Sequence, residues 1–267
     1  MWGLNFPNQY STMLKTVTNN TRTSFGGSLP FSKLKEDPRL LTLFAGMAFS
    51  KEYNEDRGHG NALYDVEHIA RITENSPATC YACKTANNPK LWDEMGLDAY
   101  GKVKFKDMSG HMQYSIGCAN CHEANTMRLV VTNPALENAL MAQSKDWRTF
   151  TCQEMRTVVC ANCHMPYTRD GAAKFSTHDV KSPLLNAETA CGACHTNVSY
   201  VIERVQIIQN QVFTTMIACE DAIVEAIAAI KSASEQPNVD AGFLEEAHRL
   251  HRESQLRWDY IAAENSM

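Results

Sequence analysis

Three short stretches of this 267-residue chain decide how it folds: CANCH at residues 118–122, CANCH at residues 160–164 and CGACH at residues 191–195. In each stretch two thiols lie one turn apart, and an imidazole follows directly. Two such thiols add to the vinyl groups of one haem, and the histidine supplies an axial nitrogen to its iron. The stretches therefore predict three covalent haems, held by Cys118, Cys121, Cys160, Cys163, Cys191 and Cys194, with axial ligands His122, His164 and His195.

The same cysteine pairs are also compatible with two zinc sites built from Cys-x-x-Cys knuckles. A zinc knuckle does not require a histidine directly after its second cysteine. Because that histidine occurs three times, the pattern favours haem over zinc.

A fourth stretch, Cys80-Tyr81-Ala82-Cys83-Lys84, keeps both cysteines but replaces the histidine by Lys84. A primary amine donates σ electrons without the π system of imidazole, and the proximal ligand is a main determinant of haem reactivity. If the opposite face of such a haem is empty, its iron can bind a small substrate. Two alternatives are an electron-transfer haem that has lost its usual ligand and a bare Cys-x-x-Cys redox pair. Beside three haem motifs, we interpret this stretch as the attachment site of a catalytic haem.

The composition supports cofactor attachment in an ordinary globular protein. Eight of the ten cysteines fall in Cys-x-x-Cys pairs, which a disulfide framework would not produce, and Cys152 and Cys219 are expected to be free. The net charge of -5 argues against a nucleic-acid surface, and no apolar run approaches the length of a membrane span. Residues 1–7 lack the features of a signal peptide. Because haem c is attached outside the cytoplasm, we expect a mature form, or a fragment that begins late, in the periplasm or another extracytoplasmic compartment.

The chain is expected to be mainly α, with haems forming the core. We assign residues 1–196 to a multihaem-binding region and residues 197–267 to a long helical region of the same structural unit. Residues 198–234 contain no Pro or Gly and repeat apolar side chains at helical spacing, and a second helix follows from about Phe243. Shorter helices are predicted near residues 37–44 and 61–76, and strand signals are almost absent. The apolar stripes of the two long helices need a partner surface.

Several segments closely resemble pentahaem cytochrome c nitrite reductase, the ammonia-forming enzyme, and the resemblance runs over nearly the whole chain. Its most specific element is the lysine-containing motif, which reads CYACKTANNP at residues 80–89. The other segments that carry it are residues 35–41 (KEDPRLL), 57–59 (RGH), 163–166 (CHMP) and 257–267 (RWDYIAAENSM).

The resemblance implies a role for several side chains. Lys84 is then the proximal ligand of the catalytic haem, and Arg71, on the helix before the motif, is the active-site arginine that attracts nitrite and assists N–O cleavage. His122 and His178 match the two axial ligands of the second haem, and His59 matches the distal ligand of the third. Without the resemblance, Arg71 would be interpreted as a surface arginine and each isolated histidine as structural.

The chain departs from that family at one place, because it has four motifs where the family has five. The residues before Cys160 resemble those that precede the family's third motif. The residues after His164 resemble those that follow the family's fourth motif. A deletion between two similar motifs would produce this join. The missing stretch carries the family's calcium site and its active-site tyrosine and histidine, so the calcium site is expected to be lost. Tyr167, three residues after His164, is the one candidate for the tyrosine.

Two functions from different classes are consistent with these observations. One is a periplasmic enzyme that reduces nitrite to ammonia with six electrons, which a quinol-linked or small cytochrome donor supplies. The other is a tetrahaem electron-transfer cytochrome without catalytic activity. A hydroxylamine-oxidising relative is a weaker third interpretation, since such enzymes keep histidine at the catalytic haem. By resemblance, the long helices pair in a homodimer.

Overall fold

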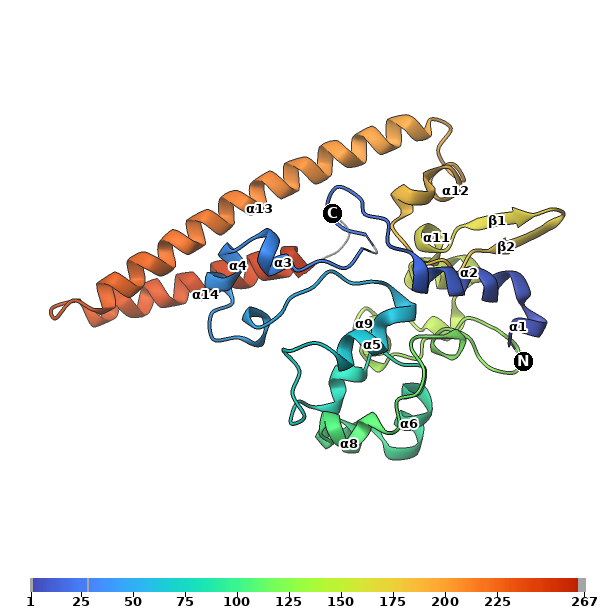
Figure 1. Cartoon of the computed structure of the whole chain (residues 1–267), viewed down its shortest axis with the longest axis horizontal. Helices are drawn as coiled ribbons and strands as arrows, with labels where there is room; N and C mark the ends of the chain where they lie inside the picture. The colour runs from blue at the N-terminus through green and yellow to red at the C-terminus, as the bar shows by residue number, and fades with distance from the viewer. Residues whose placement is uncertain (1, 28, 264–267) are drawn as a thin grey trace. The chain divides into compact units, whose positions relative to one another are not determined.

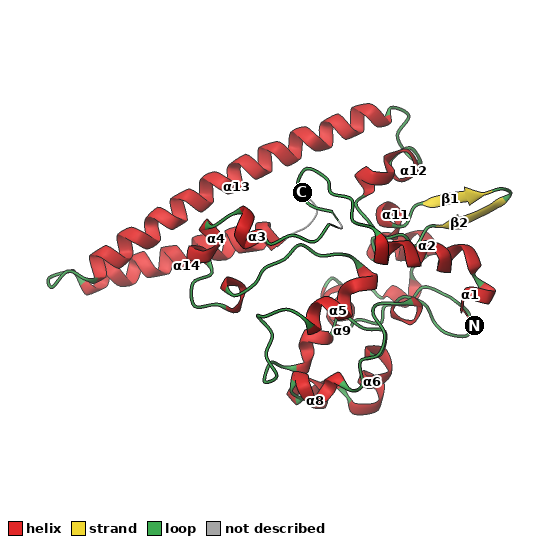
Figure 2. Ribbon diagram, in the orientation of Figure 1, coloured by secondary structure: helices red, strands yellow, loops and turns green. Residues whose placement is uncertain are grey.

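The computed structural model describes residues 2–27 and 29–263. It confirms a mainly helical chain, in which the described residues form a single β-hairpin besides isolated bridges (Figure 2). The chain divides into two compact units. One comprises Met1–Phe31 and Glu55–Val198, and the other comprises Ser32–Asn54 and Ser199–Met267. Residues 264–267 of the resemblance lie outside the described residues.

The first unit contains all four motifs and most of the short elements. Its α-helices are α1 (Trp2–Asn5), α2 (Pro7–Thr18), α5 (Ala62–Glu67), α6 (Asn88–Met95), α7 (Leu97–Lys102), α8 (Phe105–Ser109), α9 (Pro134–Ala142), α10 (Cys152–Val158), α11 (Ala161–His164) and α12 (Ala187–Ala190). Its 3-10 helices are η2 (His59–Asn61), η3 (Ala78–Tyr81), η4 (Cys118–Asn120), η5 (Trp147–Thr149) and η6 (Pro183–Asn186). Strands β1 (Tyr167–Asp170) and β2 (Ala173–Ser176) pair antiparallel, with Asp170 opposite Ala173.

The hairpin differs from the prediction of almost no strand. The two strands are joined by Gly171 and Ala172, and Gly171 has a φ of 56°. Glycine at the first of the two loop positions is the pattern of a type II′ hairpin turn, which needs a positive φ there. The pair Gly171-Ala172 is therefore the signal that could have predicted the hairpin.

The predicted helix over residues 61–76 is shorter than expected. Helix α5 ends at Glu67, and His68 follows as its C-cap, stacked on Tyr64 with ring centroids 4.0 Å apart. The β-branched residues Ile69, Ile72 and Thr73 come next and disfavour further helical turns. Arg71 therefore lies in a turn and not on the helix that the sequence predicts.

The second unit is built on two long helices. Helix α13 (Val198–Ser234) has the predicted bounds, and α14 (Ala241–Ala263) runs back alongside it to form a helical hairpin (Figure 1). Its other elements are α3 (Lys33–Glu36), α4 (Arg39–Leu43) and η1 (Ala48–Ser50). The sequence pattern assigns residues 32–54 to the region of the motifs, but Leu43 and Phe44 pack with Ile223 and Trp258 in one apolar cluster.

An ionic cluster joins α4 to α13 within this unit. The Arg39 guanidinium lies 2.6 Å from Asp37, 3.0 Å from Glu220 and 2.8 Å from Asp221. Glu220 is 2% exposed, and burial together with the neighbouring Asp37 raises its pKa to about 8. One of the three carboxyls therefore holds a proton at neutral pH, which reduces the excess of negative charge around one cation.

Candidate haem-binding site

The lysine-containing motif lies on a buried frame of aromatic rings. Tyr81 is fully buried and stacks on Phe105, with ring centroids 4.1 Å apart and planes within 6°. The Asn88 amide donates to the Tyr81 carbonyl at 2.6 Å, and the Tyr100 hydroxyl bonds both Asn88 Oδ1 at 2.8 Å and the Ala78 carbonyl at 3.1 Å. Buried polar groups that satisfy each other in this way specify one backbone arrangement. The frame fixes the 3-10 helix η3 that carries Cys80.

Charged groups surround this motif. Burial raises the pKa of the Cys80 thiol, and the nearby Arg71 guanidinium opposes that rise. Arg71 therefore lies beside the motif although it is in a turn. Burial also lowers the pKa of His59, and the positive charges of His164 and Lys84 lower it further. The structure thus brings Arg71, His59 and Lys84, which the sequence singles out separately, to one part of the first unit.

His59 combines a deep position with an open face. It begins η2 directly after Gly58, whose φ of 82° would strain any side chain. Surrounding protein desolvates the ring and lowers its pKa, yet the side chain is exposed at its surface. This imidazole is open on one side and lies near His164. That is the position expected of an axial ligand to the haem that His164 also binds. Its role as that ligand stays a prediction.

His122 and His178 face each other across a pocket. Their ring centroids are 6.3 Å apart. Two iron–imidazole bonds of about 2 Å each, extended by half of each ring, span a distance of this size. Met13, Cys118 and Cys121 are among the residues that line the same pocket. The residues present therefore fit a haem that is attached at Cys118 and Cys121 and ligated on both faces.

Each of these histidines is oriented by a backbone carbonyl. Nδ1 of His122 lies 2.8 Å from the Met127 carbonyl, and Nδ1 of His178 lies 2.9 Å from the Ser176 carbonyl. A ring that donates from Nδ1 presents Nε2 as its free electron pair, which is the arrangement that fixes metal-binding histidines. Burial lowers the pKa of His178, which also favours the neutral ring that binds a metal.

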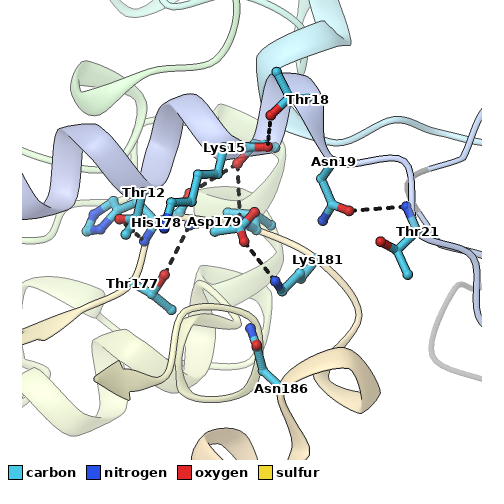
Figure 3. A network of polar contacts seen from close by, with 12 residues as sticks. Thr12, Lys15, Thr18, Asn19, Thr21, Thr177, His178, Asp179, Lys181 and Asn186 are labelled. Carbon is cyan, nitrogen blue, oxygen red and sulfur yellow. Dashed lines mark hydrogen bonds and ion pairs between the residues drawn. The ribbon is translucent and has the colours of Figure 1, made fainter. Parts of the chain in front are cut away.

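The segment at residues 177–181 is held by helix α2 (Figure 3). The Thr12 hydroxyl accepts from the His178 amide at 2.9 Å. The Thr16 hydroxyl accepts from the Val180 amide and donates to the His178 carbonyl, both at 3.2 Å. Both threonines are buried, and Lys181 forms an ion pair with Asp179 at 2.8 Å. Helix α2 therefore fixes the backbone on both sides of His178.

The same segment orients a second histidine. The Lys181 carbonyl lies 3.0 Å from Nδ1 of His164. Five consecutive residues thus contribute one imidazole directly and hold another by hydrogen bonding. Sequence reasoning finds His178 through the family resemblance but misses Thr12 and Thr16, because a threonine in a helix carries no signal of a long-range hydrogen bond.

The motif at residues 191–195 is the most exposed of the four. Cys194 and His195 are exposed, and Cys191 is half-buried with its pKa raised by burial and by the nearby Cys163. A Cβ at Gly192 would lie 2.3 Å from the Glu188 carbonyl. The other two histidine motifs carry alanine at this position, so the tight turn after α12 explains the glycine.

Tyr167 lies on strand β1 and is exposed. The guanidinium carbon of Arg156 stands 4.3 Å from its ring centroid, and Nζ of Lys174 stands 4.9 Å from it. Two cations thus flank the ring, and its catalytic role stays a prediction. Among the described residues, no group of three or more His, Cys, Asp or Glu side chains could hold a metal ion. None of the described helices is long and apolar enough to cross a membrane.

The chain matches a family model described as Cytochrome c552 in two segments, residues 1–164 and residues 158–267. A cytochrome c-552 from Bacteroides fragilis is 26% identical over 98% of this chain and 70% of its own length. A cytochrome c nitrite reductase subunit NrfA from Nitratidesulfovibrio vulgaris is 27% identical over 98% of this chain and 72% of its own length. Four other cytochrome c-552 relatives match over only 36% or 37% of their length.

A solved cytochrome c nitrite reductase from Desulfovibrio desulfuricans has the same fold, with a TM-score of 0.91 and 25% identity. The match covers 99% of this chain and 79% of that one, whose description mentions two calcium sites. The alignment with the Bacteroides fragilis protein extends over 350 positions and that with the Nitratidesulfovibrio vulgaris protein over 375. At least 83 and 108 of these positions therefore have no counterpart in the 267 residues here. The two family matches overlap at residues 158–164, which contain the second histidine motif.

Proposed function

Because the chain belongs to the cytochrome c552 family, we propose that it reduces nitrite to ammonia at a haem held by Cys80, Cys83 and Lys84. The observation that carries this proposal is the lysine-containing motif, fixed on its buried aromatic frame with Arg71 beside it. Conversion of nitrite to ammonia takes nitrogen from +3 to -3 and consumes six electrons. The haem supplies an iron centre that binds nitrogen ligands and passes single electrons.

In this proposal the side chains of the chain divide the remaining work. Lys84 would hold the iron of the catalytic haem through its amine, and that haem would supply the centre at which nitrite is reduced. The Arg71 guanidinium attracts the anion and donates hydrogen bonds to its oxygens, so that negative charge developing on a leaving oxygen is stabilised. Tyr167 is the candidate proton donor. The buried frame around Tyr81 excludes water behind the motif.

We assign four covalent haems to the chain. His122 and His178 would hold the haem at Cys118 and Cys121, His164 and His59 would hold the haem at Cys160 and Cys163, and His195 would hold the haem at Cys191 and Cys194. The two family matches overlap at residues 158–164. This overlap supports the interpretation that the motif at residues 160–164 joins the start of one family motif to the end of the next. The family's calcium site would be lost with the missing stretch, and this expectation stays a prediction.

Electrons would come from a quinol-linked or small cytochrome donor, in the periplasm. We also propose that the second unit forms a homodimer. An apolar groove of about 1010 Å³ runs between α13 and α14. Phe213, Phe243, Leu250 and Leu256 are exposed on these helices, and such surfaces are commonly buried between subunits.

One observation favours the alternative of an electron-transfer cytochrome without substrate chemistry. The relatives contain a stretch that this chain lacks, and the stretch is long enough to hold a further motif and additional catalytic side chains. In that alternative every iron is ligated on both faces.

The test uses protein matured with haem-attachment machinery. Pyridine haemochrome analysis should give four haems per chain, and a high-spin signal should shift when nitrite is added. Lys84→Ala should abolish that shift, and Arg71→Gln should weaken nitrite binding, whereas Arg169→Gln on the exposed hairpin should leave both unchanged. Four low-spin haems that do not respond to nitrite would contradict the proposed enzyme and support the electron carrier.

A further inference from the structure

Among the described residues, Arg156 is a buried cation without a charged partner. It lies near the end of α10 and is 6% exposed. Its Nε donates to Asn162 Oδ1 at 3.1 Å, and one Nη donates to the Ser176 hydroxyl at 3.1 Å. The other Nη donates to the carbonyls of Ala161 at 3.1 Å and Met165 at 3.0 Å. All four acceptors are neutral, and no carboxylate of the described residues forms an ion pair with it.

A buried guanidinium in such surroundings is unusual on energetic grounds. Removing a charge from water is costly unless an opposite charge compensates the lost hydration. Hydrogen bonds to neutral groups satisfy donors but leave the charge uncompensated. A guanidinium has five N–H groups, and the four bonds above leave one N–H of the Ser176-bound nitrogen for another acceptor.

The position of Arg156 indicates where that acceptor belongs. Its side chain lines the pocket between His122 and His178. The other described residues that line the pocket are apolar or neutral, apart from the imidazoles, and none is an Asp or Glu. The pocket therefore offers three imidazoles, of which His122 and His178 face each other, together with apolar walls and one fixed positive charge. A flat apolar ligand with a carboxylate on its edge matches this set.

We propose that Arg156 pairs with a propionate carboxylate of the haem held between His122 and His178, and thereby sets the reduction potential of that haem. The proposal rests on the haem attachment in the proposed function but not on nitrite reduction. Adding one electron converts the ferric to the ferrous state and makes the group more negative by one charge. A buried cation stabilises the more negative state, so Arg156 raises the potential.

The test compares three variants of the haem-loaded protein in a spectroelectrochemical titration. Arg156→Gln keeps an amide donor but removes the charge, and it should shift the midpoint potential of one low-spin haem to a more negative value. Arg156→Lys keeps the charge and should leave that potential near the wild-type value. Arg169→Gln, on the exposed strand β1, should change none of the potentials.

Equal shifts in Arg156→Gln and Arg156→Lys would overturn the proposal, because loss of the hydrogen bonds to α11 would then explain both. An unchanged potential in Arg156→Gln with a full haem count would overturn it as well. If Arg156→Gln cannot be produced, the resonance Raman spectrum of Arg156→Lys tests the proposal instead. The propionate bending band should move with the change of donor, and an unmoved band contradicts the pairing. If Arg156→Gln shows the potential shift but the wild-type protein does not reduce nitrite, only the proposed function is contradicted.

Discussion

Around Lys84 the protein buries aromatic rings against one another, whereas around Cys163 and Cys194 it leaves thiols and imidazoles exposed. Residues 63–112 contribute nine buried side chains to one cluster, including Tyr81, Tyr100 and Phe105. In residues 160–195 the described chain forms no such cluster, although it has two motifs there. The proposed catalytic haem therefore lies against a protein core, and the two later haems would themselves serve as the core. A cofactor that must hold a substrate in one geometry benefits from a rigid frame, while one that only passes electrons needs less.

The strongest way to break this comparison is to withhold haem. In protein produced without the attachment machinery, we expect residues 78–112 to keep slow amide exchange and residues 160–195 to lose it, because only the first segment has apolar contacts of its own. Hydrogen–deuterium exchange by mass spectrometry measures both segments in one sample. Helices α13 and α14 carry no motif and act as the internal control. Equal loss in the two segments would contradict the comparison.

The core around Lys84 can also be weakened directly. Met108 is 1% exposed in that cluster, and Met108→Ala should lower the free energy of unfolding by about 2–5 kcal/mol through lost burial and the cavity left behind. The matched control is Met141→Ala on α9, where the side chain is 63% exposed and the change should be within about 0.5 kcal/mol. Thermal unfolding followed by circular dichroism gives both values. Similar losses for the two variants would show that the cluster is not the stabilising core.

The second unit provides a reference region that contains no motif. Glu220 has a pKa raised from 4.5 to about 8 by burial and by Asp37, so the folded state binds its proton more tightly than the unfolded chain does. Its contribution to stability is complete below pH 4.5 and is lost as the pH rises toward 8. Glu220→Gln should remove this slope and leave the protein about 1–3 kcal/mol more stable than wild type at alkaline pH. Chemical denaturation at several pH values tests this, and an unchanged slope in the variant would assign it to other groups.

An effect of similar size is expected where helix α2 holds the residues around His178 by hydrogen bonds. Thr16→Val removes a buried hydroxyl that bonds both His178 and Val180, and it should cost about 1–3 kcal/mol because the Val180 amide loses its acceptor. The low-spin signal of the haem at Cys118 and Cys121 should also broaden as His178 gains freedom. Thr18→Val, at the exposed end of the same helix, is the control. Electron paramagnetic resonance of both variants gives the comparison, and identical spectra would contradict a positioning role.

Much of the fold and of the site is accessible from the sequence because covalent chemistry and helical periodicity leave local signals. The four motifs and the bounds of α13 can be predicted from spacing within a few residues. The sequence pattern places Arg71 on a helix, whereas β-branched residues end α5 before it. It misses the hairpin at Tyr167 because the decisive signal there is a single dipeptide.

Other features depend on contacts between distant residues and could not be predicted. Nothing in the sequence relates Thr12 to His178 or Arg39 to Glu220, since each pair lies more than 160 residues apart and meets only through tertiary packing. The uncompensated charge of Arg156 is likewise visible only when its four acceptors are known.

The hold of α2 on residues 177–181 has a consequence for biogenesis. Helix α2 is synthesised first, yet its hydrogen-bond partners follow 162 to 166 residues later. Thioether formation at Cys118 and Cys121 requires none of these distant contacts. The hydrogen bonds that hold His178 form only when residues 12–16 meet residues 177–181 in the folded first unit. Contacts of such large sequence separation form slowly, so we expect the position of His178 to be fixed later than the local structure around each motif.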